Sequence, residues 1–104
     1  MMYTQSALVT IVTTGVPVAL ATGHTPATDV FITAVTASGT LVVGGVNPVT
    51  KVASVSASGD LGIPLIASAT LLLPPASVAA PYDLSNIYID GTAADTVSVT
   101  YLLR

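Results

Sequence analysis

Charged side chains are scarce in this sequence of 104 residues. They make up 7% of the chain, with no glutamate and only two basic residues, whereas ordinary soluble domains carry roughly 25%. A net charge of −3 without any basic patch excludes nucleic acid as a partner, because phosphate contacts require clustered lysine or arginine. The absence of cysteine excludes disulfides and thiolate metal sites.

Long hydrophobic runs are also missing, although 52% of the residues are hydrophobic and the mean hydropathy is +0.85. The most apolar segment, residues 61–81, is interrupted repeatedly by glycine, proline, serine and threonine. No window reaches the roughly 18 apolar residues that a membrane-spanning helix needs, so no membrane partner is expected. The first basic residue is Lys51, so we also expect no secretory leader, which requires a basic N-terminal segment.

Threonine and serine make up most of the polar residues, and together with valine they recur in patterns that alternate with a period of two. β-Branched residues in such an alternation favour strands over helices. We expect one domain, residues 1–104, with a weak strand around Val52 and Val55 that could equally be a loop. The other predicted strands span residues 7–13, 17–21, 29–36, 40–44, 63–66, 70–73, 86–90 and 97–103. Both faces of 29–36 are nearly apolar, which predicts a central strand.

The end of the chain carries the clearest strand pattern. Apolar and hydroxyl side chains alternate from Val97 to Leu103, with Ser98 and Thr100 on the opposite face from the valines. Asp90-Gly91 and the residues up to Asp95 form a turn sequence, which predicts a hairpin joining residues 86–90 to 97–103.

About eight short strands separated by regular turn signals indicate an all-β protein. We expect a single antiparallel β-sandwich that is jelly-roll-like. An immunoglobulin-like sandwich is the alternative, although its cysteines and tryptophan are absent.

The side chains that catalysis requires are nearly absent. His24 is the only histidine, and it lies in a Gly- and Pro-flanked loop with no nucleophile-elbow pattern nearby. Asp83, Asp90 and Asp95 lie in or beside turns, where aspartate accepts backbone N–H bonds. Asp83, Asn86 and Asp90 also lack the ligand spacing of a calcium loop. We therefore predict no catalytic residues, no metal site and no cofactor.

Exposed apolar and aromatic residues are the candidates for a protein interface. Successive side chains of a strand point to opposite faces, so the leucines at 71–73 must occupy both faces of theirs. The tyrosines at 82, 88 and 101 could form a sugar-stacking platform, but core and interface roles in a sandwich are favoured. The predicted interface residues are Leu71, Leu72, Leu73, Tyr88 and Tyr101.

Four segments resemble parts of small tailed-bacteriophage virion proteins. Residues 83–92 and 95–102 are similar to their closing "L-x-x-I-Y-V-x-G-T … D-x-V-S-V-x-Y-L" pattern. Residues 41–47 resemble their "V-Y-V-G-G-x-N" strand and turn, and residues 62–65 their "G-x-P-L". The resemblance spans about residues 29 to 104, and the nearly uncharged stretch 47–59 departs from it.

This resemblance implies a jelly-roll-like sandwich that serves as a capsid decoration (cement) protein on the virion surface, made in the cytoplasm of a bacterial host. The implied partners are the major capsid protein and further copies of the chain, with a trimer expected. The alternative is a tail, fibre or receptor-binding component that recognises a host glycan or protein. The family supplies no catalytic residues, and we expect no enzymatic activity.

Overall fold

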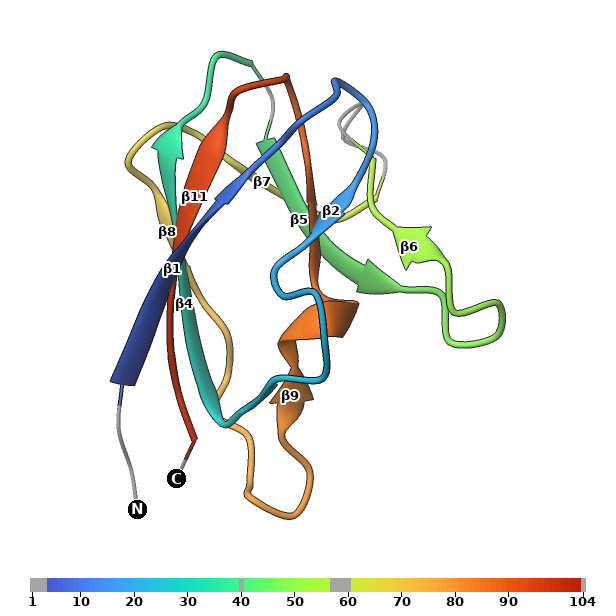
Figure 1. The fold of residues 1–104 in the computed structure, drawn as a ribbon, viewed down its shortest axis with the longest axis vertical. Helices are drawn as coiled ribbons and strands as arrows, with labels where there is room; N and C mark the ends of the chain where they lie inside the picture. Colours follow the sequence, from blue (N-terminus) through green and yellow to red (C-terminus); the bar gives the residue numbers. More distant parts are fainter. Residues whose placement is uncertain (1–3, 40, 57–60, 104) are drawn as a thin grey trace.

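The computed structural model describes residues 4–39, 41–56 and 61–103 (Figure 1). Across these residues the chain forms short strands and one 3₁₀ turn, η1 (Leu84–Asn86), and no helix there is long and apolar enough to cross a bilayer. The strands are β1 (Thr4–Thr10), β2 (Val18–Ala19), β3 (Pro26–Ala27), β4 (Asp29–Thr36), β5 (Leu41–Val46), β6 (Ala53–Ser54), β7 (Ile63–Leu65), β8 (Thr70–Leu72), β9 (Tyr82–Asp83), β10 (Tyr88–Asp90) and β11 (Thr96–Leu102).

Two antiparallel sheets contain most of the strands. Sheet A has the order β1-β11-β4-β8, and sheet B has the order β2-β10-β5 with both β6 and β7 pairing with β5. β3 and β9 form a separate small ladder. The pairs are nested along the chain: β1 with β11, β2 with β10, β4 with β8, and β5 with β7. Each pair encloses the next along the chain, so the outer pairings join residues that are far apart in the sequence.

Alternation along the strands places one face of each sheet in a shared apolar core. From sheet A the core receives Val30, Ile32, Ala34, Val97 and Val99, all fully buried. Sheet B contributes Leu41, Val43 and Ile89. The all-β prediction is confirmed, and β4 has the predicted bounds and lies between two neighbours in sheet A.

The predicted C-terminal hairpin is wrong. β10 pairs with β2 and β5 in sheet B, whereas β11 pairs with β1 and β4 in sheet A. Residues 91–95 therefore cross from one sheet to the other. Ile11 on the β1 side holds this connection through two backbone bonds, since its N–H donates to the Asp95 carbonyl at 2.9 Å and its carbonyl accepts from the Ala94 N–H at 2.8 Å. Alternation in the sequence shows which face of a strand is buried, but it does not show which strand lies beside it. The turn sequence after Asp90 therefore fits a hairpin within one sheet and a connection between two sheets equally well.

Several strand limits differ from the prediction because the pairing depends on distant residues. β3 and β9 form in segments where the sequence predicts no strand, because a two-residue ladder is too short to show an alternating pattern. β5 continues through Gly44 and Gly45 to Val46. At Gly44 a Cβ would lie 2.9 Å from Cβ of Val55, so glycine at this position allows the segment around Val55 to pack closely against β5. The sequence Ser58-Gly59-Asp60 also predicts a turn, but it lies outside the residues that the structure describes.

Candidate functional site

The outward side of sheet A is the broadest candidate surface. We define the outer face of sheet A as the side chains on its solvent side. Four large apolar side chains are exposed on it: Leu8 is 70% exposed, Leu72 56%, Val35 52% and Phe31 39%. Phe31 and Leu72 are direct cross-strand partners. The remaining members of this face are Thr4, Ser6, Thr10, Asp29, Thr33, Thr70, Thr96, Ser98, Thr100 and Leu102.

Hydroxyl groups on this face bond to one another across the strands. The Ser6 and Thr100 hydroxyl oxygens lie 3.1 Å apart, and those of Thr33 and Thr70 lie 2.9 Å apart. Asp29, at one end of β4, is the single charged residue among the described strands of this face. Contact with another protein would therefore bury no charged side chain of the outer face other than Asp29. The desolvation cost of such a contact is low for this reason.

Most of the charged residues that the structure describes are buried or half-buried. Asp90 and Asp95 are buried, Asp29 and Asp83 are half-buried, and Lys51 is exposed in the loop after β5. Asp95 accepts hydrogen bonds from the Ser38 N–H at 3.0 Å and the Thr92 N–H at 3.3 Å. Asp95 thus stabilises a loop by accepting backbone hydrogen bonds. Because its carboxylate is buried, it adds no charge to a surface that already carries few charged side chains.

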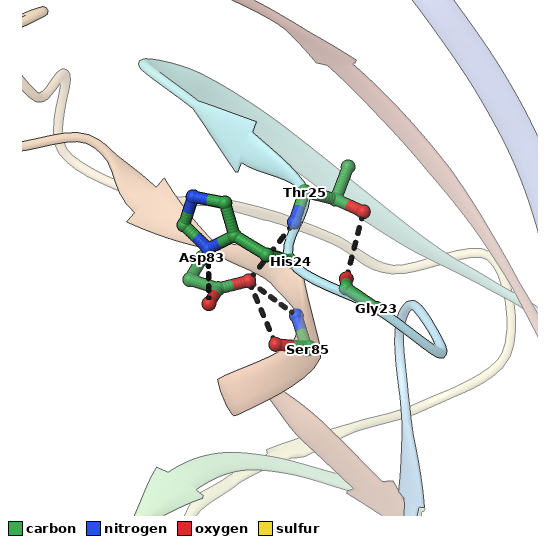
Figure 2. A network of polar contacts seen from close by, with 5 residues as sticks. All are labelled: Gly23, His24, Thr25, Asp83 and Ser85. Atoms are coloured by element: carbon green, nitrogen blue, oxygen red, sulfur yellow. Dashed lines mark hydrogen bonds and ion pairs between the residues drawn. The ribbon is translucent and has the colours of Figure 1, made fainter.

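Asp83 is the centre of a second candidate site, which joins β9 to the loop before β3 (Figure 2). One carboxylate oxygen accepts a hydrogen bond from His24 Nδ1 at 2.8 Å. The other accepts from the Thr25 N–H at 3.1 Å and from the Ser85 hydroxyl at 2.8 Å. The same oxygen also accepts from the Ser85 N–H at 3.0 Å, so Asp83 caps η1.

Serine, histidine and aspartate meet at this point, but the arrangement is not that of a nucleophilic relay. Partial burial alone would raise the pKa of the Asp83 carboxyl. The hydrogen bonds from His24, Thr25 and Ser85 outweigh burial and hold this pKa well below its usual range. In a relay the hydroxyl bonds to the imidazole, whereas Figure 2 shows Ser85 and His24 bound to opposite oxygens of one carboxylate. The cluster therefore ties two segments together.

The structure separates the predicted interface residues. Leu72 lies on the outer face of sheet A, whereas Leu71 and Leu73 turn inward and pack against the core. Tyr101 also packs there, and its hydroxyl donates to Gln5 Oε1 at 2.8 Å. Tyr88 is half-buried on β10 in sheet B. The expectation that the leucines occupy both faces of β8 matches this arrangement, but the five residues do not form one surface.

Two of the hollows on the described surface lie beside residues named above. One, of about 330 Å³, is almost wholly apolar and is lined by Val43, Gly44, Gly45, Ile63, Leu71, Leu73, Tyr82 and Ile87. The other, of about 210 Å³, is lined by Gln5, His24, Thr25, Pro26, Tyr101, Leu102 and Leu103. No group of three or more potential metal-ligating side chains occurs in the residues that the structure describes.

Comparison with known proteins gives no family. No family model matches the chain, and no curated protein matches it. The chain is similar to a solved structure described as "Bacillus endospore appendages form a novel family of disulfide-linked pili", with a TM-score of 0.46 and 9% identity over 99% of this chain and 89% of that one. At this distance the likeness carries no argument about function, and this chain has no cysteine with which to form a disulfide.

Sequence reasoning missed three exposed apolar members of the outer face, Leu8, Phe31 and Val35. The signal was present in 29–36, where apolar residues on both faces predicted a strand central to the protein. β4 has a neighbouring strand on each side within sheet A, but only one of its two faces is covered. The face that carries Phe31 is exposed. An apolar strand on both faces thus indicates either full burial or a face meant for a partner.

Proposed function

We propose that the chain is a structural virion protein, a capsid decoration protein that stabilises a phage head by packing on the major-capsid subunits. One observation carries the proposal: the outer face of sheet A exposes Leu8, Phe31 and Leu72 among hydroxyl side chains and holds a single charge at its margin. Surfaces of this kind serve as contact sites for other proteins. The resemblance to tailed-phage virion proteins supplies the setting.

The proposed mechanism is thermodynamic. A protein that binds the assembled shell and not the dissociated subunits shifts the equilibrium toward the shell by mass action. Binding requires a surface that gives up water cheaply, and the paired hydroxyls Ser6–Thr100 and Thr33–Thr70 already satisfy one another. No chemical step is part of this function.

The test at the level of the particle is depletion and add-back. Particles lacking the protein should assemble but release their genome at lower temperature or after osmotic shock, and added protein should restore their tolerance. Phe31→Lys and Leu72→Lys should abolish the restoration, because each places a charge within the outer face. Val49→Lys is the matched control, since Val49 is 85% exposed in a loop away from sheet A.

A receptor-binding component is the second candidate, and the hollow beside Tyr101 favours it. That hollow combines a tyrosine, a glutamine and His24, the mixture of ring and polar groups that suits a small polar ligand. Under this alternative, depleted particles would be as robust as complete ones but would fail to adsorb to cells. That result would replace the decoration proposal.

A further inference from the structure

β1 is an open edge of sheet A. It pairs on one side with β11 over its full length, from Thr4 opposite Leu102 to Thr10 opposite Thr96. Within the part of the chain that the structure describes, no strand lies on its other side. A free edge presents a row of backbone donors and acceptors to which another strand can bond.

Hydrogen-bond alternation identifies the outward-facing groups. In an antiparallel pair, every second residue directs both its N–H and its C=O toward the partner strand. The Ile11 N–H donates to the Asp95 carbonyl, so the odd-numbered residues of β1 are those bonded toward β11. The even-numbered residues, Thr4, Ser6, Leu8 and Thr10, therefore direct their N–H and C=O groups away from the sheet.

The other sheet edges carry features that discourage pairing, and β1 does not. β2 follows directly on Pro17, β7 contains Pro64, β8 runs into Pro74 and Pro75, and β6 has two residues. Proline cannot donate a ladder bond, and short strands offer few groups. β1 is seven residues long, TQSALVT, with no proline, no charge and no register shift in its pairing with β11. Among the edges of sheets A and B in the described residues, β1 is therefore the one that lacks such protection.

We propose that β1 pairs antiparallel with β1 of a second copy of this chain, about a two-fold axis, so that two copies of sheet A become one continuous sheet. The same strand is used on both sides, so the contact closes at two copies and does not propagate. The resulting unit is a dimer, in place of the trimer that the phage resemblance implies.

Geometry also selects the register. Even-numbered residues must face even-numbered residues for the outward groups to bond. The register centred on Ala7 pairs the whole strand, with Thr4 opposite Thr10 of the second copy and Ser6 opposite its Leu8. No charged side chain occurs on either strand. The contact uses the edge of sheet A and leaves its outer face free, so it stands or falls separately from the proposed function.

Amide hydrogen exchange on the unmodified protein, with a mass measurement by sedimentation, tests the pairing. A dimer of two 10.3 kDa chains is expected at micromolar to millimolar concentration. In it the Ser6, Leu8 and Thr10 amides should be protected along with Ala7 and Val9, and on dilution the even-numbered amides alone should lose protection. A monomer throughout, an open-ended series of larger species, or a dimer with unprotected even-numbered amides would each overturn the proposal.

Two substitutions test the strand and its register. Leu8→Pro removes an outward N–H without touching a bond to β11, so it should give a folded monomer. Val12→Pro is its control, because Val12 is exposed beyond the end of β1 and should leave the dimer intact. A dimer that persists in Leu8→Pro, or one lost equally in both variants, contradicts pairing through β1.

Cysteine cross-linking provides the second test, in a chain that has no other cysteine. At Ala7 the two copies would form a non-hydrogen-bonded pair, whose Cα atoms lie about 4.5 Å apart, within the range that a disulfide spans. Ala7→Cys should therefore form a disulfide-linked dimer on mild oxidation. Ala67→Cys, which is exposed in the β7–β8 turn, should not. Equal cross-linking of both variants, or none of Ala7→Cys, refutes the register.

Discussion

Val99 and Thr100 are adjacent on β11 and face opposite sides of sheet A, which makes them a matched pair for measuring what each side contributes. Val99 is fully buried between Ala7 and Ile32 on the core side. Thr100 lies half-buried on the outer face, between Ser6 and Phe31. The same substitution at the two positions should therefore give very different losses of stability.

The magnitudes follow from burial. Val99→Ala removes two buried methyl groups and should lower the free energy of unfolding by about 2 kcal/mol. Val99→Asp places an unpaired charge in the core and should cost several kcal/mol, a large part of the roughly 5–15 kcal/mol that holds a domain folded. Thr100→Ala loses a partly exposed hydroxyl bond to Ser6 and should cost under about 1 kcal/mol.

Urea unfolding followed by circular dichroism measures all three variants. Each should keep the slope of the wild-type transition, with midpoints in the order Thr100→Ala, Val99→Ala, Val99→Asp from most to least stable. Equal losses from Val99→Ala and Thr100→Ala would refute the assignment of the inner and outer faces of sheet A. The measurement belongs at low protein concentration, so that association through β1 does not add stability to every variant.

Two further predictions concern loops. Gly62→Ala should destabilise the protein by more than about 1 kcal/mol in the same assay, because Gly62 has a φ of +103° and a Cβ there would lie 2.5 Å from Val42 Cγ1. Gly23→Ala is the control, since a Cβ at Gly23 would meet open space. Hydrogen bonds lower the pKa of Asp83, so its contribution to stability is complete above the unfolded-state pKa of about 4 and is lost as the pH falls below it. The melting temperature of Asp83→Asn should therefore fall less than that of the wild type between pH 5 and pH 2, and equal falls would contradict this role.

The strands could be predicted largely from the sequence, and their partners could not. Alternation in residues 29–36 and 97–103 placed β4 and β11 correctly, because burial of one face is a local property of each strand. The sheet to which β10 belongs depends on β2 and β5, which are far away in the sequence. A turn sequence such as Asp90-Gly91 fits a hairpin and a crossing between sheets equally well.

The candidate site shows the same division. The apolar and aromatic residues of the sequence pointed to a surface for protein contact. The turn interpretation of Asp83, Asp90 and Asp95 agrees with the backbone N–H bonds that these residues accept. The His24–Asp83 pair joins residues 59 positions apart, and no local pattern indicates it. The exposure of Phe31 depends on what covers sheet A, a property of the folded molecule and its neighbours.

The pairing of β1 with β11 sets an order of events during synthesis. Residues 11–95 lie between these two strands, so β1 emerges from the ribosome long before its partner exists. Nested, non-local pairing of this kind makes folding slow, and during that time both edges of an uncharged strand are open. The β1 strands of neighbouring nascent chains on the same messenger RNA could then pair with each other incorrectly. A chaperone that holds the first strand until residue 102 has been added would therefore raise the yield of folded protein more than one that acts on the finished chain.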